Sequence, residues 1–81
     1  MNFKSMNADE KSLDAIRIKV NGGERDIPAG TSVSALLLIL GIEGRRIAVE
    51  LNREIVPKSE HVKRVLAEGD QLEIVTMVGG G

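Results

Sequence analysis

The sequence predicts an α+β fold in which a mixed sheet of four to five strands packs on one main helix. Segments in which apolar and polar residues alternate recur along the chain, and one stretch between them carries apolar residues at helical spacing. Glycine, proline and asparagine separate these segments, as expected of turns. With 81 residues, the chain has room for one domain with one small core.

The chain divides into three regions. Residues 1–15 are polar, charged and without sustained periodicity, so we expect a disordered N-terminal extension. Residues 16–78 hold the alternating and helical segments and form the predicted folded domain. Residues 79–81 are glycines, and glycine loses more backbone freedom on ordering than any other residue. We therefore expect a flexible C-terminal tail that follows the last strand directly.

The first two predicted strands form a hairpin. Residues 16–20 alternate between apolar and polar side chains, which is typical of a half-buried strand. The sequence Asn-Gly-Gly at residues 21–23 tolerates positive φ and predicts a turn. The second strand, residues 24–27, ends at Pro28.

One main helix is predicted over residues 33–40. Ser32 stands at the N-cap position, and Gly41 stands where a left-handed C-terminal cap is expected. Such a cap folds Ile42 back onto the last turn. The apolar face of this helix consists of Val33, Leu36, Leu37 and Leu40.

Leu38 lies on the opposite side of the predicted helix from that apolar face. A solvated helix normally carries a polar residue at such a position, which makes Leu38 a candidate contact for a partner protein. A singly exposed leucine is also ordinary on folded proteins, and we favour that interpretation.

Two short strands and a helical turn follow. Residues 47–51 alternate and predict the third strand. Residues 55–56 form a short strand that Pro57 stops, because proline cannot donate to a central sheet ladder. Ser59 is a candidate cap for a single helical turn, and His61 is expected to face solvent. The apolar residues of that turn are Val62, Val65 and Leu66.

The last predicted strand, residues 71–78, runs directly into the glycines. Alternation places Val75 and Met77 on one face of this strand. The other face carries Leu72, Ile74 and Thr76. If the second face covers the helix, Val75 and Met77 lie towards solvent beside the tail and are candidate docking residues for a partner. The alternative is that a neighbouring loop or the N-terminal extension covers them, and the sequence leaves both open.

Composition argues against several classes of function. The formal net charge is -1 and Phe3 is the single aromatic residue, so the chain lacks the basic excess and the stacking surface of a nucleic-acid binder. No cysteine and one histidine argue against a zinc cluster, a disulfide framework or a thiol nucleophile. The longest fully apolar run, residues 35–40, is too short to span a bilayer, and the N-terminus lacks a signal-peptide hydrophobic region. We therefore expect a cytoplasmic protein without a large catalytic cleft.

Several stretches together resemble one known family. They are residues 30–33 with Leu36 and Leu37, residues 48–57, and residues 68–75 followed by the terminal glycines. From Ile16 to Gly81 the chain is similar to the thiamine sulfur-carrier (ThiS) family of the ubiquitin-like superfamily. The Asn-x-Glu-Ile-Val-Pro motif at residues 52–57 is the most characteristic part. The resemblance implies a ubiquitin-like β-grasp fold, and the N-terminal extension departs from the family pattern.

The resemblance also implies a chemistry. Gly81 would be adenylated by an ATP-using, ThiF-like adenylyltransferase and converted to a thiocarboxylate with sulfur from a cysteine-desulfurase-derived persulfide. The thiocarboxylate would then donate its sulfur to thiazole formation at a thiazole synthase. Gly79 and Gly80 would present the terminal carboxylate to each partner. The implied protein is a carrier without bound cofactor, metal or catalytic residues, and is not itself an enzyme.

Three alternatives remain open. The small subunit of molybdopterin synthase shares the fold and the diglycine end but passes sulfur to a different acceptor, and residues 52–57 favour the thiamine family. A ubiquitin-like protein modifier would join Gly81 to lysines of other proteins. A β-grasp binding domain with an idle tail would tolerate loss of the terminal glycines.

Overall fold

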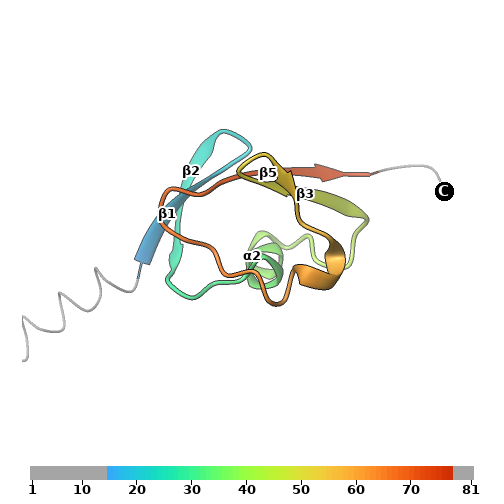
Figure 1. Ribbon diagram of the computed structural model, residues 1–81, viewed down its shortest axis with the longest axis horizontal. Helices are drawn as coiled ribbons and strands as arrows, with labels where there is room; N and C mark the ends of the chain where they lie inside the picture. The colour runs from blue at the N-terminus through green and yellow to red at the C-terminus, as the bar shows by residue number, and fades with distance from the viewer. Residues whose placement is uncertain (1–14, 78–81) are drawn as a thin grey trace, which may run out of the picture.

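A computed structural model describes residues 15–77, which form a five-stranded mixed sheet with the order β2-β1-β5-β3-β4 (Figure 1). In this part of the chain, one α-helix packs on a single face of the sheet. The predicted α+β fold, a mixed sheet of four to five strands on one main helix, is therefore confirmed. The elements are β1 (Ala15–Val20), β2 (Gly23–Pro28), α2 (Val33–Leu40), β3 (Ile47–Leu51), β4 (Glu54–Ile55), the 3₁₀ helix η1 (Lys58–Glu60) and β5 (Gln71–Thr76).

Strand β5 comes last in the described chain but lies at the centre of the sheet. It runs parallel to β1 and antiparallel to β3. Parallel neighbours cannot be joined by a tight turn, and α2 and the β3–β4 hairpin lie between β1 and β5 in the sequence. The strand that leads to the predicted tail is therefore paired on both sides. Strand β1 begins at Ala15, one residue before the predicted start, and Val78 lies outside the described residues.

The β1–β2 hairpin closes on the turn that the sequence predicts. Asn21 and Gly22 both have positive φ, 51° and 88°. A type I′ turn requires this combination, and its twist matches that of the flanking strands. The register pairs Val20 with Gly23 across the turn.

Helix α2 begins and ends where the sequence predicts. The Oγ atom of Ser32 accepts a hydrogen bond from the backbone N–H of Ala35 at 3.0 Å, which satisfies one of the unpaired donors of the first turn. Gly41 closes the helix with φ 74°, and the N–H of Ile42 donates to the carbonyl of Leu37 at 3.0 Å. This left-handed cap turns Ile42 back against the core.

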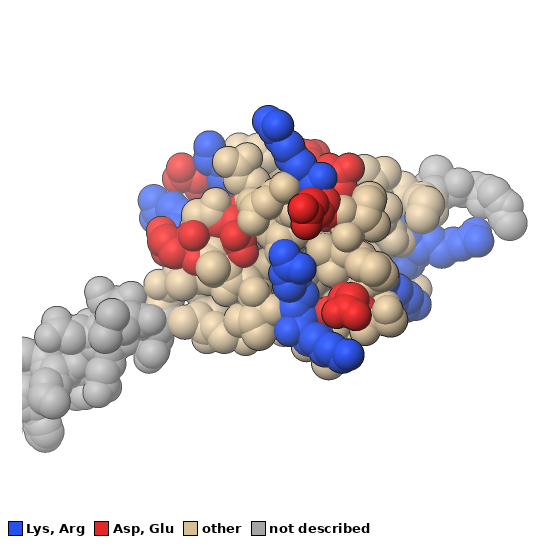
Figure 2. Space-filling model, in the orientation of Figure 1, with Lys and Arg blue, Asp and Glu red and all other residues tan. Residues whose placement is uncertain are grey.

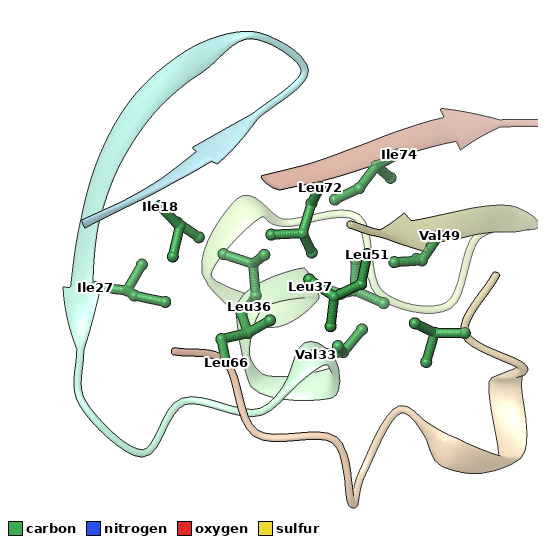
Figure 3. Close-up of a cluster of buried hydrophobic side chains, with 11 residues drawn as sticks. Ile18, Ile27, Val33, Leu36, Leu37, Val49, Leu51, Leu66, Leu72 and Ile74 are labelled. Atoms are coloured by element: carbon green, nitrogen blue, oxygen red, sulfur yellow. The ribbon is translucent and has the colours of Figure 1, made fainter. Parts of the chain in front are cut away.

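The core lies between α2 and the inner face of the sheet and is aliphatic throughout (Figure 3). Complete burial of an aliphatic side chain of this size stabilises the folded state by roughly 1.5–3 kcal/mol relative to exposure. The core therefore holds the helix firmly against β5 and its neighbours. Its residues are Ile18, Ile27, Val33, Leu36, Leu37, Val49, Leu51, Val56, Leu66, Leu72 and Ile74.

The segment between β4 and β5 differs from the predicted helical turn. Ser59 lies inside η1 and caps nothing, while Pro57 takes the N-cap position without a side-chain hydrogen bond. Val62 and Val65 are exposed, and of the predicted apolar residues Leu66 alone is buried. The reason is tertiary, because backbone hydrogen bonds join this segment to the residues just before and at the start of α2. The segment still closes short turns, with backbone hydrogen bonds from Lys63 and Arg64 back to the carbonyl of Glu60, but these turns end where Val65 pairs with Ser32.

The prediction that His61 faces solvent is also wrong. His61 is 7% exposed, and its Nε2 atom lies 3.0 Å from the carbonyl oxygen of Val56. The backbone carbonyl of His61 accepts a hydrogen bond from the N–H of Ser34 at 2.9 Å, which holds the residue against the start of α2. The Val56 carbonyl makes the burial possible, because an imidazole buried without a hydrogen-bond partner would destabilise the fold.

The helix of the described chain is short, with eight residues in α2. Within residues 15–77, no helix is long and apolar enough to cross a membrane. In the same range, no three or more histidine or acidic side chains are placed so that they could hold a metal ion.

Candidate functional site

The residues predicted to carry the chemistry, Gly79, Gly80 and Gly81, lie outside the described residues. The described chain shows instead how the strand that leads to them is held. We call residues 75–77 the tail root. Their surroundings define where the terminal glycines begin.

Strand β3 holds the tail root from one side. The antiparallel register pairs Ile47 with Thr76. One residue further, the backbone N–H of Met77 donates to the carbonyl of Arg46 at 2.7 Å. Hydrogen bonding of the backbone therefore continues to the last described residue.

A side chain from the β1–β2 turn holds β5 from the other side. Asn21 Oδ1 accepts a hydrogen bond from the N–H of Ile74 at 2.7 Å, and Asn21 Nδ2 donates to the Ile74 carbonyl at 3.1 Å. Strand pairing between β1 and β5 ends before this point, at Val20 and Leu72. At Ile74, the side-chain amide of Asn21 therefore takes the place of the backbone partner that β1 no longer provides. This extends the support of β5 towards the tail root. Positive φ already explains an asparagine in this turn, so the sequence carries no separate signal for the contact.

Asn52 has a similar role at the start of β5. Its N–H donates to the carbonyl of Gln71 at 2.8 Å, and its Oδ1 accepts a hydrogen bond from the N–H of Gln71 at 3.0 Å. Its Nδ2 donates to Asp70 Oδ1 at 3.0 Å. Asn52 is the first residue of the Asn-x-Glu-Ile-Val-Pro motif. These bonds give that residue a structural role, because they join the β3–β4 turn to the strand that leads to the tail.

Val75 and Met77 are exposed, as the alternation of the last strand predicts. Their exposed fractions are 57% and 52%, whereas Leu72 and Ile74 are 1% and 8% exposed. The alternative that a described loop covers Val75 and Met77 is therefore wrong. Thr76, predicted on the core face, is exposed as well, because it lies beyond Ile74, the last buried residue of the strand.

Leu38, the third docking candidate, does not join this surface. It is 60% exposed, as predicted, while its neighbours Leu36 and Leu37 are buried against the sheet. Val75 lies on the outer face of the sheet, because Ile74 next to it points into the core. The helix and sheet layers therefore separate Leu38 from Val75.

An open cleft of about 410 Å³ lies next to the tail root. It is bounded by α2, the loop before β3, the segment that begins with η1, and the residue after β5. Because its lining comes from four separate segments, no sequence pattern reveals it. Its lining includes Leu37, Glu43, Arg45, Arg46, Lys58 and Met77.

Charged side chains elsewhere are mixed. Figure 2 shows acidic and basic groups interspersed on the face that it displays, without the continuous basic field typical of a nucleic-acid binder. Within residues 15–77 the ion pairs both involve Arg17, whose Nε lies 2.7 Å from Asp26 Oδ1. The hydrogen bond from Arg17 lowers the pKa of the Asp26 carboxyl, and the same bond raises the pKa of the Arg17 guanidinium. Both residues belong to the β1–β2 hairpin, so this pair is part of the scaffold.

Residues 18–81 match the model of the ThiS family. The chain is 47% identical over 66 residues to a thiazole synthase from Paramagnetospirillum magneticum and 38% identical over 66 residues to a thiazole synthase from Magnetococcus marinus. Each match covers 82% of this chain and 20% of the relative, so the chain spans about a fifth of the length of these two relatives. It is also 36% identical over 66 residues to the uncharacterized protein ycf40 of Pyropia yezoensis, over 82% of this chain and 93% of that protein.

A solved structure shares the fold. The crystal structure of the thiamine biosynthesis protein ThiS from Geobacter metallireducens matches with a TM-score of 0.71 at 26% identity, over 82% of this chain and 100% of that chain. The family match extends over the motif at residues 52–57 and the C-terminal glycines. The mixed sheet on one helix is the β-grasp arrangement that the resemblance implies. The chain therefore belongs to the ThiS family of ubiquitin-like sulfur carriers.

Proposed function

We propose that this protein is a sulfur carrier of thiamine biosynthesis and that Gly81 is the residue that carries the sulfur. The observation that carries the proposal is the position of β5, which lies at the centre of the sheet and is hydrogen-bonded as far as Met77. Because neighbouring segments hold β5 on both sides, the residues that follow it start from a fixed position on the folded domain. A partner that binds the folded body can therefore receive the terminal carboxylate in a reproducible position.

The proposed chemistry begins with activation, because a carboxylate would have to expel oxide to accept sulfur directly. Attack of the Gly81 carboxylate on the α-phosphorus of ATP forms an acyl adenylate and releases pyrophosphate. A persulfide then attacks the acyl carbon and expels AMP, which leaves an acyl disulfide. Reduction of this disulfide by a thiol releases the Gly81 thiocarboxylate and forms a disulfide on the sulfur donor.

The chain contributes the carboxylate and its position, and we assign the catalytic groups to its partners. It contains no cysteine, so the attacking sulfur has to come from another protein. ATP is consumed by the adenylating partner, and we assign no bound cofactor or metal to the carrier. In this proposal the protein is a co-substrate rather than an enzyme. It acts in the cytoplasm, where ATP and reduced thiols are available.

The proposed partners are a ThiF-like adenylyltransferase, a cysteine-desulfurase-derived persulfide donor and a thiazole synthase. The third partner is supported by the relatives from P. magneticum and M. marinus, which are thiazole synthases that contain a segment similar to this chain. In the final step the sulfur of the thiocarboxylate enters the thiazole ring. The carboxylate of Gly81 is thereby regenerated for another cycle.

Val75 and Met77 are the proposed docking residues for the adenylating partner. Both are exposed immediately before the terminal glycines, where an enzyme that encloses the tail has to contact the folded body. Leu38 is exposed to a similar extent but lies on the far side of α2. We therefore place the docking surface at the tail root, and Leu38 becomes a matched control position.

The test is a reconstituted sulfuration reaction followed by intact-mass spectrometry. With ATP, the adenylating enzyme, a persulfide donor and a reducing thiol, the full chain should gain the mass that corresponds to exchange of one oxygen for one sulfur. Fragmentation should locate the change at Gly81. A variant with one residue appended after Gly81 should gain no sulfur. Sulfuration of the extended protein without prior trimming would contradict the assignment.

The sulfur acceptor is tested separately. Thiocarboxylated protein should support thiazole formation by the thiazole synthase and should not support molybdopterin formation by the large subunit of molybdopterin synthase. The reverse result would replace thiamine biosynthesis by molybdopterin biosynthesis. Larger conjugates in cell extracts that disappear when Gly81 is deleted would instead indicate a protein modifier.

A further inference from the structure

Strand β5 extends beyond the segment that pairs with it on one side. Its pairing with β1 ends at Leu72, and the Asn21 side chain then binds the backbone of Ile74. On the other side, pairing with β3 continues to Thr76. Figure 1 shows the end of β5 running past the β1–β2 hairpin, with β3 beside it. The tail root therefore has one edge occupied by β3 and one open edge.

The hydrogen bonds of β5 show which backbone groups face the open edge. Successive residues of a strand direct their N–H and carbonyl groups to alternate sides. The N–H of Met77 donates to the carbonyl of Arg46, so the odd-numbered residues face β3. The carbonyl of Leu72 accepts a hydrogen bond from the N–H of Asn21 at 2.8 Å, so the even-numbered residues face the β1 side. The N–H and carbonyl of Thr76 therefore point to the open edge. Within residues 15–77, neither strand pairing nor a side-chain hydrogen bond reaches them there.

The sequence does not protect this edge against pairing. Charged side chains and proline at a strand edge disfavour addition of another strand. From Val75 to Gly81 the sequence has no charged side chain and no proline. Val75 and Met77, on either side of Thr76, are exposed and apolar. The glycines that follow allow a second backbone to approach closely. These properties favour addition of a strand at the tail root.

An enzyme that acts on Gly81 has to take this edge out of water. In the proposed function the terminal carboxylate enters an enclosed site, and the chain between Met77 and Gly81 enters with it. A backbone N–H or carbonyl that is buried without a partner destabilises the complex. Since β3 already occupies one side of the tail root, new partners have to come from the open side. An extended backbone segment supplies donors and acceptors at the spacing of a strand.

We propose that each enzyme that acts on Gly81 holds the tail by adding an extended segment of its own backbone to the open edge of β5. The inference rests on the sulfur-carrier function proposed above. The N–H of Thr76 donates to a carbonyl of the added segment, and the carbonyl of Thr76 accepts from one of its N–H groups. Backbone pairing requires no particular charge on the partner, so the same edge serves the adenylating enzyme and the thiazole synthase in turn. One added segment fills the edge, which makes the two enzymes mutually exclusive.

The test removes the Thr76 N–H and leaves the β3 side of the strand intact. Thr76→Pro lacks this N–H, and proline is tolerated in a strand where the N–H faces solvent. Thr76→Val keeps the N–H and changes the side chain. Glu24→Pro is the control at a distant edge. Glu24 follows Gly23, which closes the β1–β2 hairpin, so the Glu24 N–H faces away from β1 on the outer strand of the sheet.

Two reactions are measured with the enzymes of the same organism. One is kcat/KM for adenylation, and the other is the affinity of the thiazole synthase for thiocarboxylates prepared by chemical thiolysis, which bypasses adenylation. Thr76→Pro should lower both by at least about tenfold, because a buried carbonyl of the enzyme loses its donor. The losses of Thr76→Val should be at least about threefold smaller than those of Thr76→Pro. Glu24→Pro should stay within about twofold of the wild type in both measurements.

Hydrogen exchange of the wild-type protein tests the same contact without a substitution. The Thr76 amide should exchange rapidly in the free protein and at least about tenfold more slowly in complex with either enzyme. Unchanged exchange in either complex would overturn the proposal, and this result decides if Thr76→Pro lowers the unfolding midpoint. Slow exchange in the free protein that depends on its concentration would also overturn it, because a second copy of the chain would then occupy the edge.

Two further outcomes would overturn the proposal. Equal losses for Thr76→Pro and Thr76→Val would assign the effect to the side chain. A structure of either complex in which only side chains pair with the Thr76 backbone would exclude an added strand. Failure of the wild-type chain to be adenylated, or of its thiocarboxylate to bind the synthase, would instead refute the proposed function itself, independently of any variant.

Discussion

The carboxamide of Asn21 forms two hydrogen bonds with the backbone of Ile74, accepting from its N–H at 2.7 Å and donating to its carbonyl at 3.1 Å. The two residues are 53 positions apart in the chain. Their contact ties the first turn of the domain to the central strand that leads to the tail. A turn side chain thereby helps to define where the terminal glycines leave the folded body.

Replacement of Asn21 by glycine should remove the contact with Ile74 while keeping the turn. Glycine keeps the positive φ that the turn requires, 51° at Asn21, but removes both hydrogen bonds to Ile74. We expect the free energy of unfolding in urea to fall by about 1–3 kcal/mol, because the partly buried backbone of Ile74 loses its partners. Aspartate can accept a hydrogen bond but cannot donate one. The free energy of unfolding of Asn21→Asp should therefore lie between those of the glycine variant and the wild type. Unchanged stability of Asn21→Gly would show that the contact has no structural role.

Val75→Asp should slow adenylation and leave the fold intact. Val75 is 57% exposed, and a surface substitution of this kind usually shifts stability by about 0.5 kcal/mol or less. Leu38→Asp is the matched control, because Leu38 is 60% exposed on the opposite side of the molecule. Adenylation rates of the two variants with the same enzyme provide the comparison. Equal slowing by both substitutions would argue against docking at the tail root.

Ser32→Ala should destabilise the protein through loss of the cap of α2. The Ser32 Oγ accepts the N–H of Ala35 at 3.0 Å, and removal of such a cap costs about 1 kcal/mol. Ser59→Ala should change the free energy of unfolding by about 0.5 kcal/mol or less, since Ser59 caps no helix. Urea unfolding of both variants measures the difference. A larger loss for Ser59→Ala than for Ser32→Ala would contradict the observed caps.

Asp26 should contribute stability at neutral pH that disappears in acid. Its hydrogen bond with Arg17 lowers the folded-state pKa of the carboxyl below its ordinary value of 3.8. This stabilisation is fully present above the unfolded-state pKa and is lost as the pH falls through the lower folded-state pKa. Asp26→Asn should therefore flatten the acid side of the stability profile, as measured by thermal unfolding across pH. The effect should be small and weakened by salt, because the Arg17 and Asp26 side chains are each 58% exposed. If the stability of Asp26→Asn falls as steeply in acid as that of the wild type, Asp26 makes no such contribution.

The sequence by itself determined the local elements of the fold. The ends of α2 are predicted by Ser32 and Gly41, because caps act on the first and last turns of the same helix. The outward direction of Val75 follows from the two-residue period of a strand with buried neighbours. Membership of the ThiS family is likewise carried by short motifs, of which Asn52 begins the most characteristic one. All of these properties depend on residues within a few positions of one another.

The tertiary structure alone decided which distant residues meet. A polar residue in a polar stretch normally faces water, yet His61 is buried because the fold brings the Val56 carbonyl to its ring. The contact between Asn21 and Ile74 and the cleft at the tail root both arise because the last strand enters the centre of the sheet. A buried polar group is stable where some other part of the chain satisfies its hydrogen bonds, and that partner is set by strand order rather than by the residues next to it in the sequence.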